Sequence, residues 1–349
     1  MSGKQKRPSP NTFDAVIVGC GIIGLSIALA LKQRGKKVIV IDRGTQEASW
    51  AAGGMLRPLT ESESPEFLSL CLESAALYPA YVKEVERLSG MDVEYDTTGS
   101  LLIALNEQEW TELKQKHALA QQQGIASRLL DEQAAQKREP ALGRVTGALF
   151  MPSDVQLNNQ KLMEALNTIL KNEIVVGDVK KIGEHSVETE RESFTADAVI
   201  VCAGAWTDAL VPLGVAPRLG EMVRCRMAKT LRHIISRHPT YLIPRKDGTL
   251  IIGSTVKDEG FEKRVSARSV EKLREDADLL VPRIKGWPLV ETWAGFRPYR
   301  EQGLMIGKRD GVYVAAGHFR NGILLAPVTA KIISEAICDG SSRSFGVPG

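Results

Sequence analysis

A turn with three spaced glycines constrains this chain more than any other feature. Residues 15–18 form an apolar run typical of a buried parallel strand, and glycines follow it at positions 19, 21 and 24. Gly19 permits the tight turn, Gly21 lets backbone amides approach a pyrophosphate, and Gly24 lets the next helix pack closely on the strand. That helix would end at Gly35. Its N-terminus carries partial positive charge, so the pattern predicts a dinucleotide site.

A second apolar run, residues 38–41, ends in Asp42. An acid about 20 residues beyond the glycines is where such folds bind a ribose hydroxyl. The alternative is a tight strand–helix turn followed by an ordinary surface Asp42. The glycine pattern fits FAD and NAD equally well.

The same region resembles a secretory signal, because Lys4, Lys6 and Arg7 precede the apolar stretch 15–31. The glycines within the stretch and its strand–acid ending argue against that interpretation. A membrane span needs about 20 apolar residues, and this stretch is shorter and broken by glycine. We expect residues 1–12 to form a disordered tail on a cytoplasmic protein.

Composition narrows the class of protein further. The 349 residues suffice for about two domains. The net charge is +3, from 45 basic and 42 acidic residues, which gives no support to nucleic-acid binding. The 5 cysteines are scattered and suit a reducing compartment, and the 5 histidines show no metal-ligand spacing, so we expect no metal site. We see no amphipathic stretch that would bind a membrane.

Between the glycine turn and residue 290 the chain alternates helical and strand-like stretches. We expect helices over 65–88, from the cap Asn106 to about 124, after the cap Asp131, over 162–170 and after Ser266. Strands are expected at 174–176, 179–182, 222–228, 241–245 and 250–253, with a crossover at 212–219. A buried strand at 198–202 that runs into Gly204 would lie beside the first strand and face the cofactor, or would be simply another central strand.

Alternation in the stretch 290–297 places Glu291, Trp293, Gly295 and Arg297 on one face of a strand. An arginine in such a position is rarely buried unless it is paired. Arg297 would pair with Glu291 as a structural contact, or would bind the carboxylate of a substrate in a bidentate manner. Spacing alone slightly favours the structural explanation.

A second helix with a glycine at its start decides between the dinucleotides. The strand 312–315 leads into the polar loop 317–322 and a helix that reaches residue 337. This helix N-terminus would suit the electron-rich edge of a reduced flavin, which an NAD enzyme does not need. The sequence therefore predicts FAD.

These motifs resemble the glycine oxidase branch of the D-amino-acid-oxidase-like flavoproteins. The likeness rests on five segments: GCGIIG at 19–24, AAGGML at 51–56, YLIPRKDG at 241–248, WAGFRP at 293–298 and AAGHFRNGILLAP at 315–327. It implies an α/β fold: a Rossmann-like FAD-binding domain with a parallel sheet, interleaved with an α+β substrate domain built on an antiparallel sheet. The expected FAD domain comprises 13–88, 149–212 and 298–340, and the substrate domain 89–148 and 213–297.

The resemblance also assigns roles to residues. Arg297 and Tyr241 would bind the substrate carboxylate, and Arg320 would lie at the substrate site. The residues expected to bind FAD, together with the glycines of the turn, are Gly19, Gly21, Ile22, Ile23, Gly24, Asp42, Arg43, Ala48, Ser49, Gly53, Gly54, Met55, Val179, His318, Phe319, Arg320, Asn321, Gly322, Ile323 and Leu324. Val256 stands where the family often has methionine. No cysteine lies between Arg297 and Gly317, where relatives attach flavin, so non-covalent FAD is expected.

The function implied is oxidative deamination of glycine, sarcosine or small D-amino acids. A hydride would pass to flavin N5, O2 would become H2O2, and the imine would hydrolyse to glyoxylate and ammonia. In many bacteria such an enzyme supplies the imine for the thiazole of thiamine, and the family is often tetrameric. The alternatives are a D-amino-acid dehydrogenase with a quinone acceptor and a non-catalytic FAD-binding assembly protein.

Overall fold

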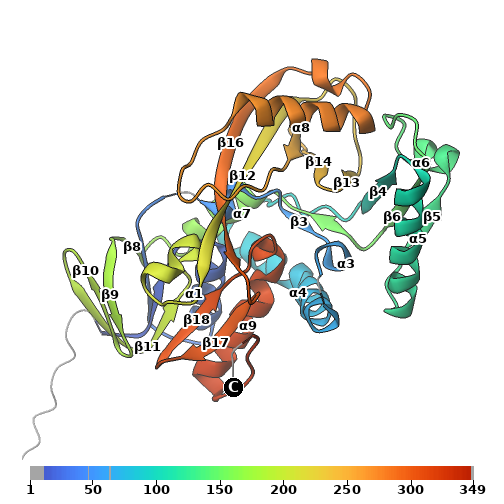
Figure 1. Cartoon of the computed structure of the whole chain (residues 1–349). Helices are drawn as coiled ribbons and strands as arrows, with labels where there is room; N and C mark the ends of the chain where they lie inside the picture. Colours follow the sequence, from blue (N-terminus) through green and yellow to red (C-terminus); the bar gives the residue numbers. More distant parts are fainter. Residues whose placement is uncertain (1–11, 46, 63, 347–349) are drawn as a thin grey trace, which may run out of the picture.

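The computed structural model describes residues 12–45, 47–62 and 64–346. Two eight-stranded sheets, each with its own helices, meet along a central junction (Figure 1). The tail expected at 1–12 lies outside the described residues except for Thr12, which begins the first strand. Among the described residues, every helix is too short or too polar to span a lipid bilayer.

The first sheet is mainly parallel and has the order β17-β18-β11-β1-β2-β8, with the hairpin β9–β10 attached to β11. Its strands are β1 (Thr12–Val18), β2 (Val38–Asp42), β8 (Ile174–Val176), β9 (Val179–Gly183), β10 (Ser186–Thr189), β11 (Ser193–Val201), β17 (Met305–Arg309) and β18 (Val312–Ala316). β1 pairs in parallel with β2 and with β11, and Ala15 lies opposite Ala198. The strand near residue 200 therefore lies beside the first strand, as one of the two interpretations predicted.

A layer of helices buries one face of this sheet. It consists of α1 (Ile22–Gln33), α4 (Pro65–Ser89), α7 (Asn159–Ile169) and α9 (Gly322–Asp339), whose apolar faces share one core with β1 and β2. α1 packs on α9, which packs on α4. Gly35 has φ of +77° and ends α1 as expected. Leu88 is 40% exposed, because it belongs to the last turn of α4.

The second sheet has the order β16-β12-β15-β14-β13-β4-β6-β5 and is antiparallel except between β13 and β4. Its strands are β4 (Ser100–Ala104), β5 (Arg128–Leu130), β6 (Gly147–Met151), β12 (Val215–Arg226), β13 (Ile234–Arg237), β14 (Thr240–Pro244), β15 (Thr249–Gly253) and β16 (Leu289–Arg300). The crossover expected at 212–219 is wrong from Val215 onward, because β12 already pairs there with β16. The mixed α/β class with both sheet types is confirmed, whereas the exact domain boundaries stay a prediction.

Three helices flank the second sheet: α5 (Glu107–Gln122), α6 (Glu132–Arg138) and α8 (Ala267–Leu280), which covers its upper face in Figure 1. The predicted caps Asn106 and Asp131 are confirmed, and α8 begins after Ser266 as predicted. Asn106, Asp131 and Ser266 accept hydrogen bonds from backbone N–H groups three residues later, at 2.9, 2.8 and 3.2 Å. α7 begins earlier than predicted, because Asn158 caps it.

Short elements fill the junction between the sheets. They are α2 (Ala48–Ala51), α3 (Pro58–Glu61), the 3₁₀ turns η1 (Gly204–Ala209) and η2 (Ile284–Gly286), and the pair β3 (Met55–Leu56) with β7 (Val155–Gln156). Arg245 fastens the second sheet to this region. It is buried and donates to the carbonyl oxygens of Leu157 at 2.8 Å and Gly53 at 2.9 Å.

Candidate active site

The glycine turn joins β1 to α1 by close backbone contact. Gly19 has φ of +112°, and a Cβ atom there would lie 2.3 Å from the carbonyl oxygen of Cys202. A Cβ atom at Gly24 would lie 2.0 Å from the carbonyl oxygen of Gly19. Both positions therefore require glycine. Gly24 was predicted to let the helix pack closely on the strand, and a Cβ atom there would also lie 3.3 Å from Ile17 Cγ2 of β1.

The N-terminus of α1 is left open for a ligand. Gly21 is its N-cap residue and provides no side-chain cap. The N–H of Ile22 donates to Ser49 Oγ at 2.9 Å, and the other first-turn N–H groups have no acceptor within the helix. Asp42, at the end of β2, accepts from the N–H of Cys20 at 2.8 Å and of Gly44 at 2.7 Å.

Two connected cavities lie in front of this turn, and we call them the outer and the inner cavity. Gly21, Ala48, Ser49, Cys202 and Gly204 line both of them. Of the residues expected to bind FAD, the outer cavity also contacts Gly19, Asp42, Arg43 and Val179. The inner cavity contacts Ile22, Ile23, Gly53, Gly54, Met55, His318, Phe319, Arg320, Gly322 and Ile323.

Three expected FAD residues line neither cavity. Gly24 packs against the turn, Asn321 lines a third cavity, and Leu324 is 1% exposed with its carbonyl oxygen bound by Ser74 Oγ at 2.6 Å. Leu324 therefore belongs to the core of α9.

The two cavities suit a dinucleotide that carries a redox ring. The outer cavity offers the open N-terminus of α1 for phosphate. Asp42 lines the same cavity from the carboxyl end of β2. The inner cavity extends to the N-terminus of α9, where Asn321 provides no side-chain cap. Helix N-termini at both ends supply N–H donors to an elongated, electron-rich group.

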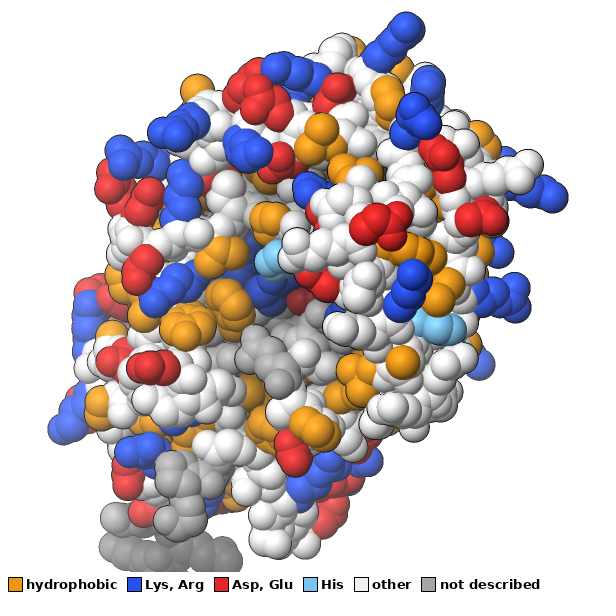
Figure 2. Space-filling model, turned by 45° about the vertical axis from the view of Figure 1, so that its right-hand side comes forward, with side chains coloured by type: hydrophobic (Ala, Val, Ile, Leu, Met, Phe, Trp, Pro, Cys, Tyr) orange, Lys and Arg blue, Asp and Glu red, His pale blue; other side chains and the backbone are white. Residues whose placement is uncertain are grey.

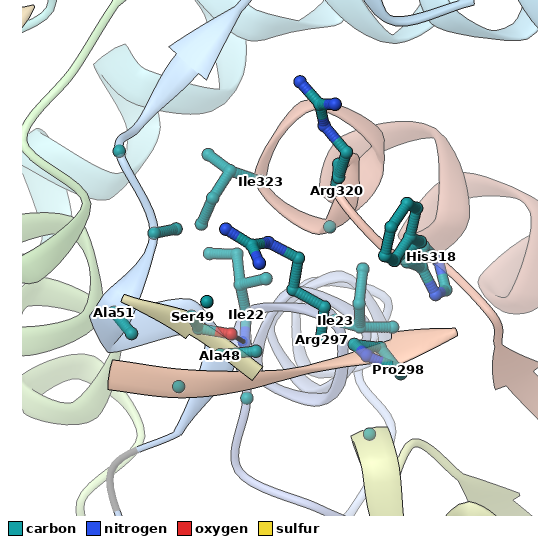
Figure 3. A pocket seen from close by; sticks show the side chains of 18 of the residues that line it. Ile22, Ile23, Ala48, Ser49, Ala51, Arg297, Pro298, His318, Arg320 and Ile323 are labelled. Atoms are coloured by element: carbon teal, nitrogen blue, oxygen red, sulfur yellow. Dashed lines mark hydrogen bonds between the residues drawn. The ribbon is translucent and has the colours of Figure 1, made fainter. Parts of the chain in front are cut away.

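Arg297 projects from β16 into the middle of the inner cavity (Figure 3). Its Nη1 donates to the carbonyl oxygen of Thr255 at 3.0 Å, and its Nη2 donates to Ser254 Oγ at 2.7 Å. No carboxylate of the described residues lies within ion-pair distance of this guanidinium. The structural partner considered above, Glu291, instead pairs with Arg224 at 3.0 Å, so that explanation is wrong.

Burial lowers the pKa of Arg297, and the nearby Arg320 lowers it further, while Tyr241 supports the charge. A partly buried guanidinium that lacks a counter-ion favours an anionic ligand. Tyr241, on β14, is 7% exposed and lines the same cavity, and its hydroxyl lies 3.3 Å from Met222 Sδ.

Two glycines make room for these side chains and were not identified from the sequence. A Cβ atom at Gly220 would lie 2.0 Å from Nη1 of Arg297, and one at Gly253 would lie 2.4 Å from a ring carbon of Tyr241. Glycine within a strand often marks such a close approach, so this signal was present in β12 and β15. Ser254 and Glu61, which also line the inner cavity, were missed too.

The loop before α9 contributes a neutral imidazole and a paired guanidinium. Burial lowers the pKa of His318 to about 3, and its Nε2 lies 3.1 Å from Thr329 Oγ1. The Nη2 atom of Arg320 lies 3.3 Å from Glu61. In Figure 3, the side chain of Arg320 points away from that of Arg297.

Val256 and the cysteines bear on pocket size and on flavin attachment. Val256 is 50% exposed and lines a neighbouring cavity near Ser254 rather than the inner cavity.

Cys20 lines the outer cavity and Cys202 both cavities. Burial raises the pKa of Cys20 to about 12 and that of Cys202 well above its usual range, so both are unreactive thiols at neutral pH.

Comparison with known proteins agrees with this geometry. The model of the family described as "FAD dependent oxidoreductase" matches residues 14–336. The chain is 33% identical to a glycine oxidase of Geobacillus kaustophilus, with 93% of each chain covered. The crystal structure of glycine oxidase from that organism superposes with a TM-score of 0.90 at 31% identity, covering 94% of this chain and 95% of the other.

A further relative is longer than this chain. The "Bifunctional protein ThiO/ThiG" of Trichormus variabilis is 34% identical over 95% of this chain. The chain spans about half the length of that relative, 53%.

Proposed function

This chain belongs to the family of FAD-dependent oxidoreductases, and from that membership we propose that it deaminates glycine and other small amines oxidatively. The observation that carries the proposal is Arg297, a partly buried guanidinium in the inner cavity with hydroxyl and carbonyl partners but no carboxylate among the described residues. Such a group recognises the carboxylate of an amino acid.

FAD would be held without a covalent bond by the open N-terminus of α1, by Asp42 and Arg43 in the outer cavity, and by the loop 318–323 in the inner cavity. When bound, FAD would supply the acceptor for a hydride from the substrate and would pass the two electrons to O2, giving H2O2. His318, whose pKa is lowered to about 3 by burial, would stay neutral in the lining of the inner cavity.

The residues of the chain would orient the substrate rather than remove its α-proton. Arg297 would bind the carboxylate, and Tyr241 would add a hydroxyl donor, which fixes the α-carbon in the inner cavity. The amine reacts in its neutral form, and hydride loss from it requires no base at the α-carbon. The imine is released to water and hydrolyses to glyoxylate and ammonia.

The decisive variant is Arg297→Ala. Loss of a buried charged contact costs about 2–5 kcal/mol, so kcat/KM for glycine should fall by about 30-fold to several thousandfold, mainly through KM. Arg218→Ala is a matched control, because Arg218 lies opposite Arg297 on β12 and pairs instead with Asp258. Both variants should stay yellow. An Arg297→Ala variant that binds glycine normally would refute the assignment.

A panel of glycine, sarcosine and D-alanine, with peroxide as the readout, tests the reaction itself. A quinone-linked dehydrogenase would reduce a dye anaerobically but form no peroxide in air. A non-catalytic protein would stay yellow when glycine is added without air. We further propose that the imine serves thiazole formation for thiamine, which a thiamine requirement of a deletion strain would test.

A further inference from the structure

A third cavity adjoins the inner cavity at Glu61, Tyr241, Phe319 and Arg320, which line both. Its other walls include α3, α5, β4, β13 and the start of β14. Figure 2 shows a hollow on this side of the molecule with Lys or Arg side chains inside it. The proposed oxidation of glycine makes no use of this space.

The lining of the third cavity carries more cations than anions. Its charged side chains are Arg57, Lys116, Arg237 and Arg320 against Glu61, Glu109 and Glu112. Arg237 and Glu109 neutralise each other at 2.8 Å, and Glu112 is exposed. Three cations, Arg57, Lys116 and Arg320, therefore remain against Glu61 and the exposed Glu112. Glu61 pairs with Arg57 at 2.8 Å and with Arg320 at 3.3 Å.

Arg57 is built into this wall. Its side chain is 2% exposed, Nη1 donates to Ser236 Oγ at 2.9 Å, and Nη2 donates to Glu61. Its Nε has no hydrogen-bond partner, and neither has the buried hydroxyl of Thr60. Both atoms are buried and closed off from the cavity, so Arg57 contributes to it the positive charge of a fixed guanidinium.

Lys116, on α5, is half-buried and has no ion-pair or hydrogen-bond partner among the described residues. Burial lowers its pKa, and the positive charge of Arg57 lowers it further. Glu61 and the buried Asp154 act in the opposite direction without outweighing these effects. An anion in the cavity would supply the counter-charge that Lys116 lacks.

We propose that the third cavity is a subsite for a second anionic group of the substrate, carried on the nitrogen of glycine. The α-carboxylate would bind Arg297, and a carboxylate on the N-substituent would bind Arg320 and Lys116. Arg320 suits this role because it lines both cavities and points away from Arg297 (Figure 3). The inference rests on the proposed amine oxidation and narrows its substrate class to N-carboxyalkyl glycines.

The chemistry is that of the proposed reaction. The C–N bond of the glycine arm loses two electrons and two hydrogens, which FAD and then O2 accept. Water adds to the imine and the C–N bond breaks, which yields glyoxylate and the amine that carries the second carboxylate. Iminodiacetate would give glyoxylate and glycine.

The test compares iminodiacetate and N-(2-carboxyethyl)glycine with sarcosine, which lacks the second acid. In Lys116→Met, the ratio of kcat/KM for iminodiacetate to that for sarcosine should fall about tenfold, because one charge-assisted hydrogen bond is lost. Lys114→Met is the matched control, because Lys114 is exposed on the same helix beside the Trp110 ring. It should leave that ratio unchanged. Equal losses for both substrates, or no oxidation of iminodiacetate by a protein that oxidises sarcosine, would overturn the subsite.

A binding measurement separates the subsite from the reaction. Glutarate has the shape of iminodiacetate but cannot be oxidised at a C–N bond, and butyrate lacks its second charge. Calorimetry on the FAD-loaded protein should show at least tenfold tighter binding of glutarate, and Lys116→Met should abolish that preference. If no amine is oxidised but this preference is found, the proposed function fails and the subsite stands. If glutarate and butyrate bind equally, the subsite fails whatever the activity.

Discussion

Arg297 owes its position to a residue that has no side chain. Gly220 lies under its guanidinium on β12, and a single methyl group there would overlap Nη1. The two hydrogen bonds to Ser254 and Thr255 hold the guanidinium in that space. Substrate recognition therefore depends on the missing Cβ atom at position 220 as much as on the positive charge of Arg297.

We expect Gly220→Ala to displace the guanidinium and to raise KM for glycine by about tenfold to a hundredfold, the value of one hydrogen bond to a charged group. FAD content should remain that of the wild type. Gly286→Ala is the control, because a Cβ atom there meets nothing within 4 Å. Unchanged steady-state kinetics in Gly220→Ala would show that the guanidinium is free to move.

His318 should make stability depend on pH. Burial lowers its pKa from 6.5 to about 3 in the folded state. Below pH 6.5 the unfolded chain binds a proton that the folded chain does not, so stability is complete above about pH 6.5 and falls toward pH 3. The slope contributed is at most about 1.4 kcal/mol per pH unit.

The measurement is the free energy of unfolding in urea across this pH range, for the wild type and for His318→Gln. The wild type should lose more stability on acidification than the variant. Asp154 acts oppositely, because burial raises its pKa to about 6, but it is present in both proteins and cancels in the comparison. If the free energy of unfolding changes with pH in the same way in both proteins, His318 does not cause the pH dependence.

At the scale of elements, one loop ties the substrate anchor to the dinucleotide cavity. We call residues 254–266 the strap. The buried Glu221 accepts from Thr255 Oγ1 at 2.9 Å and from the N–H of Ser266 at 2.6 Å, which holds both ends of the strap. At its tip, the ring of Phe261 stacks 5.1 Å from that of Trp206, which lines the outer cavity under Arg43.

Phe261→Ala should therefore speed the release of FAD. One aromatic pair contributes about 0.5–1.5 kcal/mol, so the dissociation rate should rise roughly 2- to 10-fold. The recovery of flavin fluorescence after dilution measures it. Leu289→Ala is the control, because Leu289 is similarly exposed, at 48% against 51%, but lies outside the strap. Equal FAD dissociation rates in the two variants would show that the strap does not help to retain FAD.

At the scale of the whole molecule, the two cavities are lined by segments from Val18 to Ile323. Both sheets contribute, since Gly220, Tyr241 and Arg297 belong to the second sheet and Gly19 and Asp42 to the first-sheet side. A dinucleotide bound there would contact residues of both sheets, so its binding energy adds to the stability of the folded state.

Removal of FAD should accordingly lower Tm. At a free FAD concentration one hundred times Kd the stabilisation is about 2.7 kcal/mol, which corresponds to a shift of several degrees. Calorimetric scans of the FAD-free protein with increasing FAD measure it, and AMP serves as a control that lacks the flavin ring. A Tm independent of FAD would contradict the placement of the cofactor between the two sheets.

The amino-acid sequence by itself determined the local features of this protein: the glycine turn at 19–24, the caps Asn106, Asp131 and Ser266, and Arg297 within a strand. Each depends on the backbone geometry of a few neighbouring residues, which can be predicted from residue types and their spacing. Only the tertiary structure decided that Glu291 pairs with Arg224, that Gly220 lies under Arg297, and that Lys116 and Arg57 line the same cavity. Such contacts depend on strand register and on loops that return from distant parts of the chain, and no short window of sequence contains them.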